Sequence, residues 1–144
     1  MAPAASLSYA GDISAADAWE CLKSDPRAQL IDVRTMAEWN FVGLADLSSL
    51  GRQVHRIEWQ AFPTGARNPA FVAEVGQAVS DKDAPLLVMC RSGARSRAAA
   101  IALTQAGYRQ AINIADGFEG DMDEDGHRGN RNGWKHADLP WRQG

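Results

Sequence analysis

The chain has 144 residues, of which 45% are hydrophobic and 23% charged, and its formal net charge is −3. This size and composition are typical of one soluble globular domain, which buries enough surface to fold without disulfides or a metal. The acidic balance argues against a nucleic-acid-binding or membrane-surface protein, and no stretch approaches the roughly 20 apolar residues of a membrane-spanning helix. We therefore expect residues 1–144 to form a single domain, with no nucleic-acid or membrane partner.

Two features bear on the cellular compartment. The N-terminal stretch from Met1 to Ser6 has neither a basic start nor a long apolar run, so we expect no signal peptide. The two cysteines, Cys21 and Cys90, are too few for the disulfide framework of a small secreted domain. The sequence therefore favours a cytoplasmic protein with reduced thiols.

The first half of the chain alternates predicted strands and helices. Residues 6–9 can form a short edge strand. Ser14 is a predicted N-cap, with Asp17 at the third helical position, and this helix should end at Asp25-Pro26. Three further elements are expected in this half: a strand over 28–33, a helical turn over 38–43 and a strand over 54–59.

The second half continues the alternation. Asn68 is a predicted helix cap, with Pro69 at the first helical position. The other expected elements are an apolar strand over 85–89, an alanine-rich helix over 96–105 with Gly107 as its C-cap, and a strand over 111–114. Trp134, Leu139 and Trp141 should fold the polar tail back onto the domain. Alternating strands and helices predict an α/β fold with a central, mainly parallel sheet flanked by helices.

The segment around Cys90 carries the clearest chemical signal. Cys90 follows an apolar strand, at the sheet edge where open α/β folds bind their ligands. The N–H groups of a short loop and the N-terminus of the next helix both attract an anion there. Arg91, Arg95 and Arg97 add full positive charges. These effects stabilise a thiolate and a bound anion, whereas an inert buried cysteine would not need them.

The segment from Cys90 to Ser96 resembles the active-site loop of the rhodanese-family sulfurtransferases. Further stretches match that family in order: Leu30 to Arg34 with Glu38-Trp39, then Gly107-Tyr108, then Asp116 to Gly120. The resemblance covers about residues 10–142 and implies a rhodanese-like domain. It also implies that Cys90 carries sulfur as a persulfide, and that the substrate is bound by Arg91, Ser92, Gly93, Ala94 and Arg95.

Such an enzyme would take sulfur from a small anionic donor such as thiosulfate and pass it to a thiol, a protein acceptor or cyanide, without a cofactor. Two segments depart from the family pattern. Residues 42–47 stand where family members usually carry a Gly-His-Ile-Pro-Gly-like turn, and residues 121–133 resemble an insertion before Trp134. Because both can border the site, the resemblance does not imply a particular acceptor.

The sequence suggests two alternatives to enzymatic sulfur transfer. Related phosphatases place five residues between cysteine and arginine, but four lie between Cys90 and Arg95, and the next position is Ser96. A tetrahedral phosphoryl group needs that wider loop, so phosphatase chemistry is disfavoured. Rhodanese domains also serve as non-enzymatic binding or sulfur-relay modules, and this alternative remains open although the cysteine and both loop arginines are kept.

Other polar residues have structural as well as functional interpretations. Asp32 and Arg34, at the end of the first core strand, either support the site by orienting the loop arginines or form a structural ion pair, which we favour. Glu38 is an expected partner for an arginine. Cys21 can be a resolving thiol, but a partly buried helix residue is the simpler interpretation.

The remaining candidates concern metals and apolar walls. The stretch from Asp121 to Gly126 matches the first half of a calcium loop, but Asn132 stands at the twelfth position, where such loops carry glutamate. We therefore expect a solvated acidic loop and no metal site. The aromatic residues expected either to wall the Cys90 loop or to pack in the core are Trp59, Phe62, Phe118 and Trp134.

Overall fold

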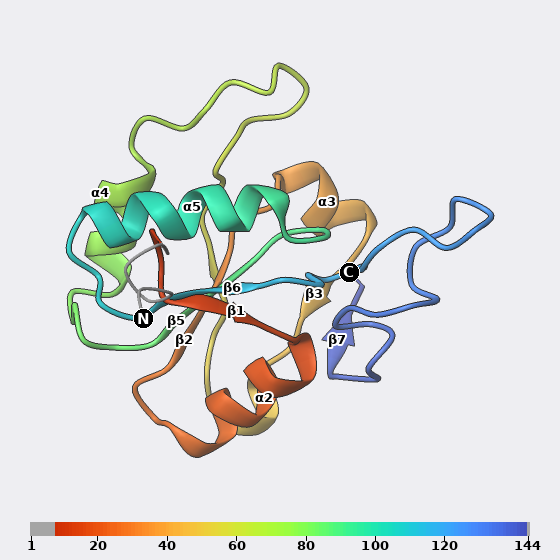
Figure 1. The fold of residues 1–144 in the computed structure, drawn as a ribbon, viewed down its shortest axis with the longest axis horizontal. Coiled ribbons are helices and arrows are strands. Elements are labelled where there is room, and N and C mark those ends of the chain that lie inside the picture. The colour runs from red at the N-terminus through yellow and green to blue at the C-terminus, as the bar shows by residue number, and fades with distance from the viewer. Residues whose placement is uncertain (1–7, 144) are drawn as a thin grey trace, which may run out of the picture.

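The fold is built on a five-stranded parallel sheet, seen in a computed structural model that describes residues 8–143 (Figure 1). The strand order is β1-β6-β5-β2-β4, and every neighbouring pair is parallel. The strands are β1 (Gly11–Ile13), β2 (Gln29–Asp32), β4 (His55–Arg56), β5 (Leu86–Met89) and β6 (Ala111–Ile114). The predicted α/β fold with a parallel central sheet is confirmed.

The two faces of the sheet bury two separate sets of apolar side chains. Helices α4 (Phe71–Ala78) and α5 (Ala94–Gln105) cover one face, and α2 (Ala15–Ser24) covers the other (Figure 1). Along β5 the side chains alternate between these faces, as a strand requires. Val88 and Cys90 therefore belong to the face covered by α5, while Met89 points to the other.

Three helices begin at or within a few residues of the positions that the sequence predicts. The Ser14 side chain accepts a hydrogen bond from the Asp17 N–H at 3.1 Å, so α2 begins as predicted. Helix α3 (Met36–Phe41) begins before the expected turn because Thr35 and Glu38 form a capping box. Helix α5 begins at Ala94, two residues early.

The expected Asn68 cap was wrong. The Asn68 side-chain oxygen accepts a hydrogen bond from the Ala70 N–H at 3.0 Å and forms a turn, so α4 starts only at Phe71. The expected strand over 6–9 was also misplaced. Pairing with β6 begins at Gly11, while Tyr9 buries its side chain in the core and donates a hydrogen bond to Asp12; residues 6 and 7 lie outside the described part of the chain.

The strand expected over 54–59 is shorter, because only His55–Arg56 pairs regularly with β2. Beyond it, the Ile57 and Trp59 N–H groups still donate to the carbonyls of Asp32 and Val33. The segment therefore continues beside β2 without regular ladder pairing.

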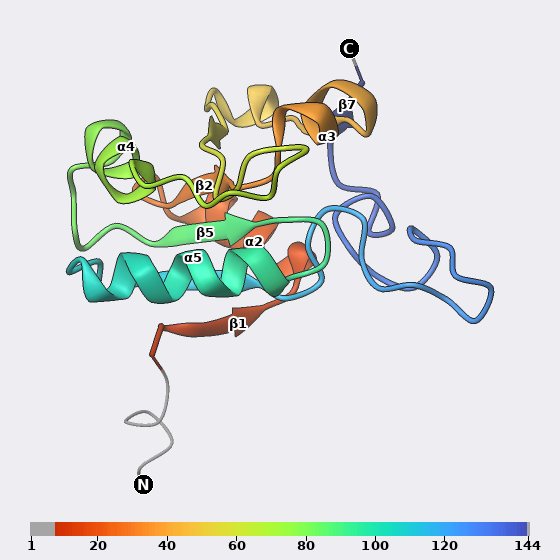
Figure 2. The same cartoon turned by 90° about the horizontal axis from the view of Figure 1, so that it is seen from above.

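The tail after β6 folds back beyond the carboxyl ends of the strands (Figure 2). Strand β7 (Trp141–Arg142) pairs antiparallel with β3 (Leu44–Ala45), which follows α3, and a short 3-10 helix over Ser48–Leu50 comes next. Trp134 is fully buried, its ring edge-on to Trp19 at 5.9 Å. Leu139 packs against the same core, so the predicted return of the tail is confirmed.

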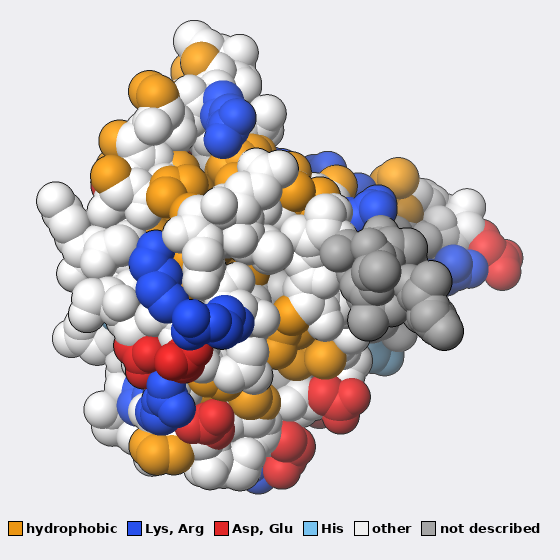
Figure 3. Space-filling view, turned by 60° about the vertical axis from the view of Figure 1, so that its left-hand side comes forward, with side chains coloured by type: hydrophobic (Ala, Val, Ile, Leu, Met, Phe, Trp, Pro, Cys, Tyr) orange, Lys and Arg blue, Asp and Glu red, His pale blue; other side chains and the backbone are white. Residues whose placement is uncertain are grey.

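The surface shows mixed charge. On the face in Figure 3, basic side chains lie beside acidic ones rather than in one continuous basic patch. Exposed ion pairs join Arg27 to Asp81 at 2.7 Å and Arg109 to Asp83. Within residues 8–143 no helix has both the length and the apolar character needed to cross a bilayer.

Trp134→Ala should lower the free energy of unfolding by about 3–5 kcal/mol, because it removes a large, fully buried side chain. Trp141→Ala is the matched control and should cost less, because 39% of Trp141 is exposed. Urea unfolding followed by circular dichroism measures both. An equal loss for the two variants would contradict the assignment of Trp134 as the anchor of the tail.

Candidate active site

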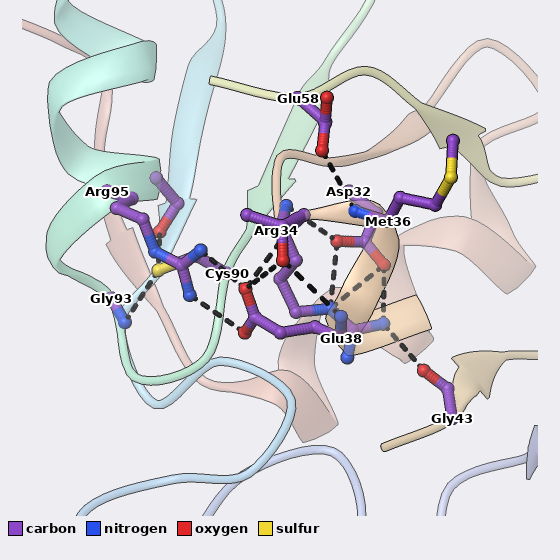
Figure 4. Close-up of polar contacts among 11 residues, drawn as sticks. Asp32, Arg34, Met36, Glu38, Gly43, Glu58, Cys90, Gly93 and Arg95 are labelled. Atoms are coloured by element: carbon purple, nitrogen blue, oxygen red, sulfur yellow. Dashed lines mark hydrogen bonds and ion pairs between the residues drawn. The ribbon is translucent and has the colours of Figure 1, made fainter. Parts of the chain in front are cut away.

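Cys90 directly follows β5 and begins the loop that leads into α5. The cysteine is buried, with 1% of its surface exposed. Its Sγ accepts a hydrogen bond from the Gly93 N–H at 3.1 Å, and the Ser96 Oγ lies 3.3 Å from it (Figure 4). Strand β5 therefore places the sulfur where one loop N–H and one hydroxyl converge.

Two glycines allow this loop to pack tightly. Gly93 has a φ of +103°, and a Cβ there would lie 2.3 Å from the Ala115 carbonyl oxygen. Gly117 has a φ of +64°, and its Cβ would lie 2.5 Å from the Arg91 carbonyl oxygen. Since L side chains rarely adopt such φ values, only glycine fits at either position.

The turn after β6 holds the outer side of the Cys90 loop. The Cys90 carbonyl accepts a hydrogen bond from the Phe118 N–H at 2.8 Å. The Arg91 carbonyl accepts from Glu119 and Gly120 at 3.0 and 3.1 Å. These bonds turn the loop carbonyls away from the sulfur and leave an N–H facing it. The sequence indicated this supporting turn only through the family resemblance of Asp116 to Gly120.

Arg95 lies in the first turn of α5 and is fixed by Glu38 of α3 (Figure 4). Its two terminal nitrogens donate to the two Glu38 oxygens at 2.6 and 2.9 Å, a bidentate ion pair. The arginine partner expected for Glu38 is confirmed. Asp32 does not orient Arg95, because Asp32 is paired with Arg34 and the capping box at Thr35 aims Glu38 at Arg95.

The protonation of this pair follows from the same contacts. Burial by itself raises the pKa of Glu38, but the hydrogen bonds from Arg95 and Thr35 outweigh it and hold the pKa below its usual value. The hydrogen bond to Glu38 likewise raises the pKa of Arg95. Arg95 therefore stays protonated, and its charge is paired with the Glu38 carboxylate beside the loop.

Arg91 behaves differently from Arg95. Its side chain is exposed and lines an opening of 590 Å³ together with Glu38, Arg95 and Glu119. Phe62, an exposed aromatic of the predicted set, and Phe41 contribute to the same opening. No sequence pattern pointed to Phe41, because it reaches this opening only through the packing of α3 in the folded protein.

Asp32 and Arg34 form a buried ion pair beside the site (Figure 4). An Arg34 terminal nitrogen lies 2.7 Å from the Asp32 carboxylate and also donates to the Gly43 carbonyl at 2.8 Å. The guanidinium lies 4.2 Å from the Phe118 ring centroid. Both side chains are fully buried, and their hydrogen bonds join them to each other and to the Gly43 carbonyl rather than to Arg91 or Arg95. The geometry thus favours the structural interpretation of this pair.

Other candidate residues lie away from the sulfur. Cys21 sits on α2 at the opposite face of the sheet from Cys90, and burial raises the pKa of its thiol. Trp59 packs edge-on against Phe71 in the core. Phe118 and Trp134 are buried in the α2-side core, so of the four aromatics only Phe62 lines the opening.

In the acidic stretch from Asp121 to Gly126, the Asp123 carboxylate is already engaged in local hydrogen bonds. The Asp123 carboxylate accepts from the N–H groups of Asp125 and His127 and from the Asn130 side chain. Across residues 8–143, no group of three or more His, Cys, Asp or Glu side chains is arranged to hold a metal ion.

The comparisons with known proteins agree with this geometry. Residues 10–144 match the family described as the STR4 middle domain. The Arabidopsis thaliana rhodanese-like domain-containing protein 4 is 26% identical over 129 residues, which are 89% of this chain and 25% of that protein. The chain belongs to the rhodanese-like family. An uncharacterized protein of Rickettsia conorii is 36% identical over 132 residues, covering 91% of this chain and 96% of that protein.

Solved structures show the same rhodanese-like fold. The crystal structure of Rv0390 from M. tuberculosis has a TM-score of 0.86 and 51% sequence identity, and the match covers 94% of this chain and 99% of that one. The polysulfide-sulfur transferase homodimer of Wolinella succinogenes has a TM-score of 0.59 at 20% identity, over 92% of this chain and 78% of that one. The second likeness concerns the fold alone.

Glu38→Gln should remove a pH-dependent part of the stability. Because the folded pKa of Glu38 is lowered, its contribution is full above about pH 4.3, the ordinary glutamate value, and is lost as the pH falls through the folded value. The difference in free energy of unfolding between wild type and variant, measured in urea at several pH values, should therefore shrink on acidification. Glu20→Gln, at an exposed ion pair, is the control. A pH-independent difference at Glu38 would contradict the ion pair's role.

Proposed function

We propose that this rhodanese-like domain is a sulfurtransferase that carries a sulfane sulfur on Cys90. The observation that carries the proposal is the environment of the Cys90 Sγ. It accepts a hydrogen bond from the Gly93 N–H, in a loop whose carbonyls are bonded to the turn behind it, and the neighbouring Arg91 and Arg95 line an opening. Such an environment favours a thiolate and attracts an anionic sulfur donor.

The first half-reaction loads the enzyme. The Cys90 thiolate attacks the outer sulfur of a donor such as thiosulfate, and a new S–S bond forms at Sγ. The bond between the two thiosulfate sulfurs breaks, and its electron pair leaves with sulfite. Because sulfite leaves as a stable anion, no general acid is required. The enzyme is left with a Cys90 persulfide.

The second half-reaction releases the sulfur. A thiolate acceptor, free or on a protein, or cyanide in an assay, attacks the outer sulfur of the persulfide. The S–S bond to Cys90 breaks, and its electron pair returns to Sγ. Two successive half-reactions on one covalent intermediate imply ping-pong kinetics. The chemistry requires a reduced thiol, which fits the cytoplasmic location we propose.

A non-enzymatic binding or sulfur-relay module is the second candidate. The exposed Phe41 and Phe62 beside the opening favour it, because exposed aromatics at a rim are typical of contact surfaces. A relay would still load sulfur onto Cys90 but would release it only to a particular protein. Turnover with small acceptors therefore separates the two candidates.

Cys90→Ser should abolish sulfur loading while the fold is kept. After incubation with thiosulfate, intact mass spectrometry should find wild type one sulfur atom heavier and the variant unchanged, and a reducing thiol should reverse the gain. Cys21→Ser is the matched control and should load normally, because Cys21 lies on the other face of the sheet. Loading of the Cys90→Ser variant, or Cys90-dependent hydrolysis of an aryl phosphate, would overturn the proposal.

Arg91→Ala and Arg95→Ala should fail in different ways. Arg91 is exposed at the opening, so its loss should chiefly raise KM for thiosulfate, by about tenfold. Arg95 is fixed by Glu38 in the first turn of α5, so its loss should also lower kcat. Lysine should rescue position 91 better than position 95, because it restores charge but not the bidentate geometry. Equal effects on KM alone at both positions would show that Arg95 is only a surface charge.

A further inference from the structure

The Ser96 hydroxyl is a buried polar group beside the Cys90 sulfur. Ser96 lies in α5 and is fully buried. Its Oγ lies 3.3 Å from the Cys90 Sγ and 2.5 Å from the Asn113 side-chain oxygen. A serine hydroxyl carries one proton, so it can donate to only one of these two acceptors at a time.

The orientation of Asn113 is fixed by its other partners. Its amide nitrogen donates to the Asp12 carboxylate at 3.0 Å and to the Gly93 carbonyl at 3.3 Å. Both partners only accept, so the nitrogen must face them and the amide oxygen must face Ser96. Asp12 is held in turn by the Tyr9 hydroxyl at 2.9 Å. Asn113 is therefore a permanent competitor for the Ser96 proton.

We propose that Ser96 is a further catalytic residue, whose hydroxyl donates its hydrogen bond alternately to the Asn113 side-chain oxygen and to the Cys90 sulfur. When Cys90 is a neutral thiol, its S–H donates a hydrogen bond to the Ser96 Oγ, and the Ser96 hydroxyl donates to the Asn113 side-chain oxygen. When Sγ is an anion, the hydroxyl turns and donates to Sγ beside the Gly93 N–H. No covalent bond is made or broken in this rotation. Asn113 acts through Ser96 and is a positioning residue.

The inference deepens the proposed function, on which it rests. In the persulfide the negative charge lies on the outer sulfur, so the Ser96 proton is free to return to Asn113. When the acceptor removes that sulfur, the electron pair of the breaking bond collects on Sγ, and the hydroxyl turns back to stabilise it. Donors aimed at a developing anion accelerate the step in which the charge appears. Ser96 therefore assists sulfur release more than sulfur loading.

The charges around the sulfur do not replace this donor. Arg91 and Arg95 approach from the loop and α5, and Glu38 of α3 neutralises Arg95. Asp32 at the end of β2 is paired with Arg34, and Asp12 reaches the site only through Asn113. A Ser96→Ala substitution removes the hydroxyl but none of these charged groups. A change in the ionisation of the Cys90 sulfur in that variant is therefore due to the loss of the hydroxyl.

The test uses Ser96→Ala, Ser96→Thr and the control Thr104→Val. Thr104 lies on the same helix, and its hydroxyl donates a hydrogen bond to the Ala100 carbonyl at 2.9 Å. We measure the rate of Cys90 alkylation against pH and the rate at which a thiol removes sulfur from the preloaded enzyme. Ser96→Ala should move the pH midpoint of alkylation upward and slow release by about tenfold, the effect of one charge-assisted hydrogen bond. Ser96→Thr should retain most of the release rate, and Thr104→Val should match wild type.

Asn113→Ala tests the competition separately. Removing the competing acceptor should move the alkylation midpoint downward, opposite to Ser96→Ala. An upward shift would overturn the proposed alternation, as would wild-type alkylation and release in a folded Ser96→Ala variant. If wild type never loads sulfur, the proposed function fails; the alkylation profiles then still decide whether Ser96 serves the Cys90 thiolate.

Discussion

The site depends on hydrogen bonds that cross from the turn after β6 to the loop after β5. The N–H groups of Phe118, Glu119 and Gly120 bind the carbonyls of Cys90 and Arg91 from behind. Each such bond contributes only about 1 kcal/mol, but together they decide which way the loop peptides face. With the carbonyls engaged outside, the Gly93 N–H is left for the sulfur. The glycines at 93 and 117 are required because the two segments approach too closely for a Cβ.

A second layer of contacts holds that turn in place. The buried Asp32–Arg34 pair closes the end of β2, and Arg34 lies against the Phe118 ring and the Gly43 carbonyl. The tail completes this layer, because Trp141 packs edge-on to Phe118 and the Lys135 ammonium binds the Val42 carbonyl at 2.9 Å. Partial burial lowers the pKa of Lys135, whose ammonium lies 4.0 Å from the Trp141 ring centroid. Residues 44–45, within the segment that departs from the expected family pattern, form the strand that pairs with β7.

Charge is distributed unequally among the basic residues of the loop. Arg95 is neutralised in a bidentate pair with Glu38, which fixes α5 against α3 and leaves little net charge there. Arg91 stays exposed at the opening and supplies the attraction for an incoming anion. Arg97 lies two residues further along α5, with its guanidinium 5.9 Å from the Tyr9 ring centroid, so it does not join them. Fixed geometry and free charge therefore come from different arginines.

The sequence by itself determined the fold class, the strand that delivers Cys90 and the helix cap at Ser14, because these depend on local pattern and on short-range hydrogen bonds. It also indicated a partner for Glu38, but it could not choose between Arg95 and other arginines. Three sets of contacts lie beyond such local patterns: the Glu38–Arg95 ion pair, the Ser96–Asn113 contact and the hydrogen bonds from the turn after β6. They join residues that are 17 to 57 positions apart in the sequence. The start of α4 was predicted wrongly for the same reason, because Asn68 makes a contact with a distant part of the chain: its side-chain amide donates to the Glu58 carbonyl. Only the tertiary structure decided these contacts, because they depend on which strands become neighbours in the sheet, and a side chain's partner is then set by distance in space rather than along the chain.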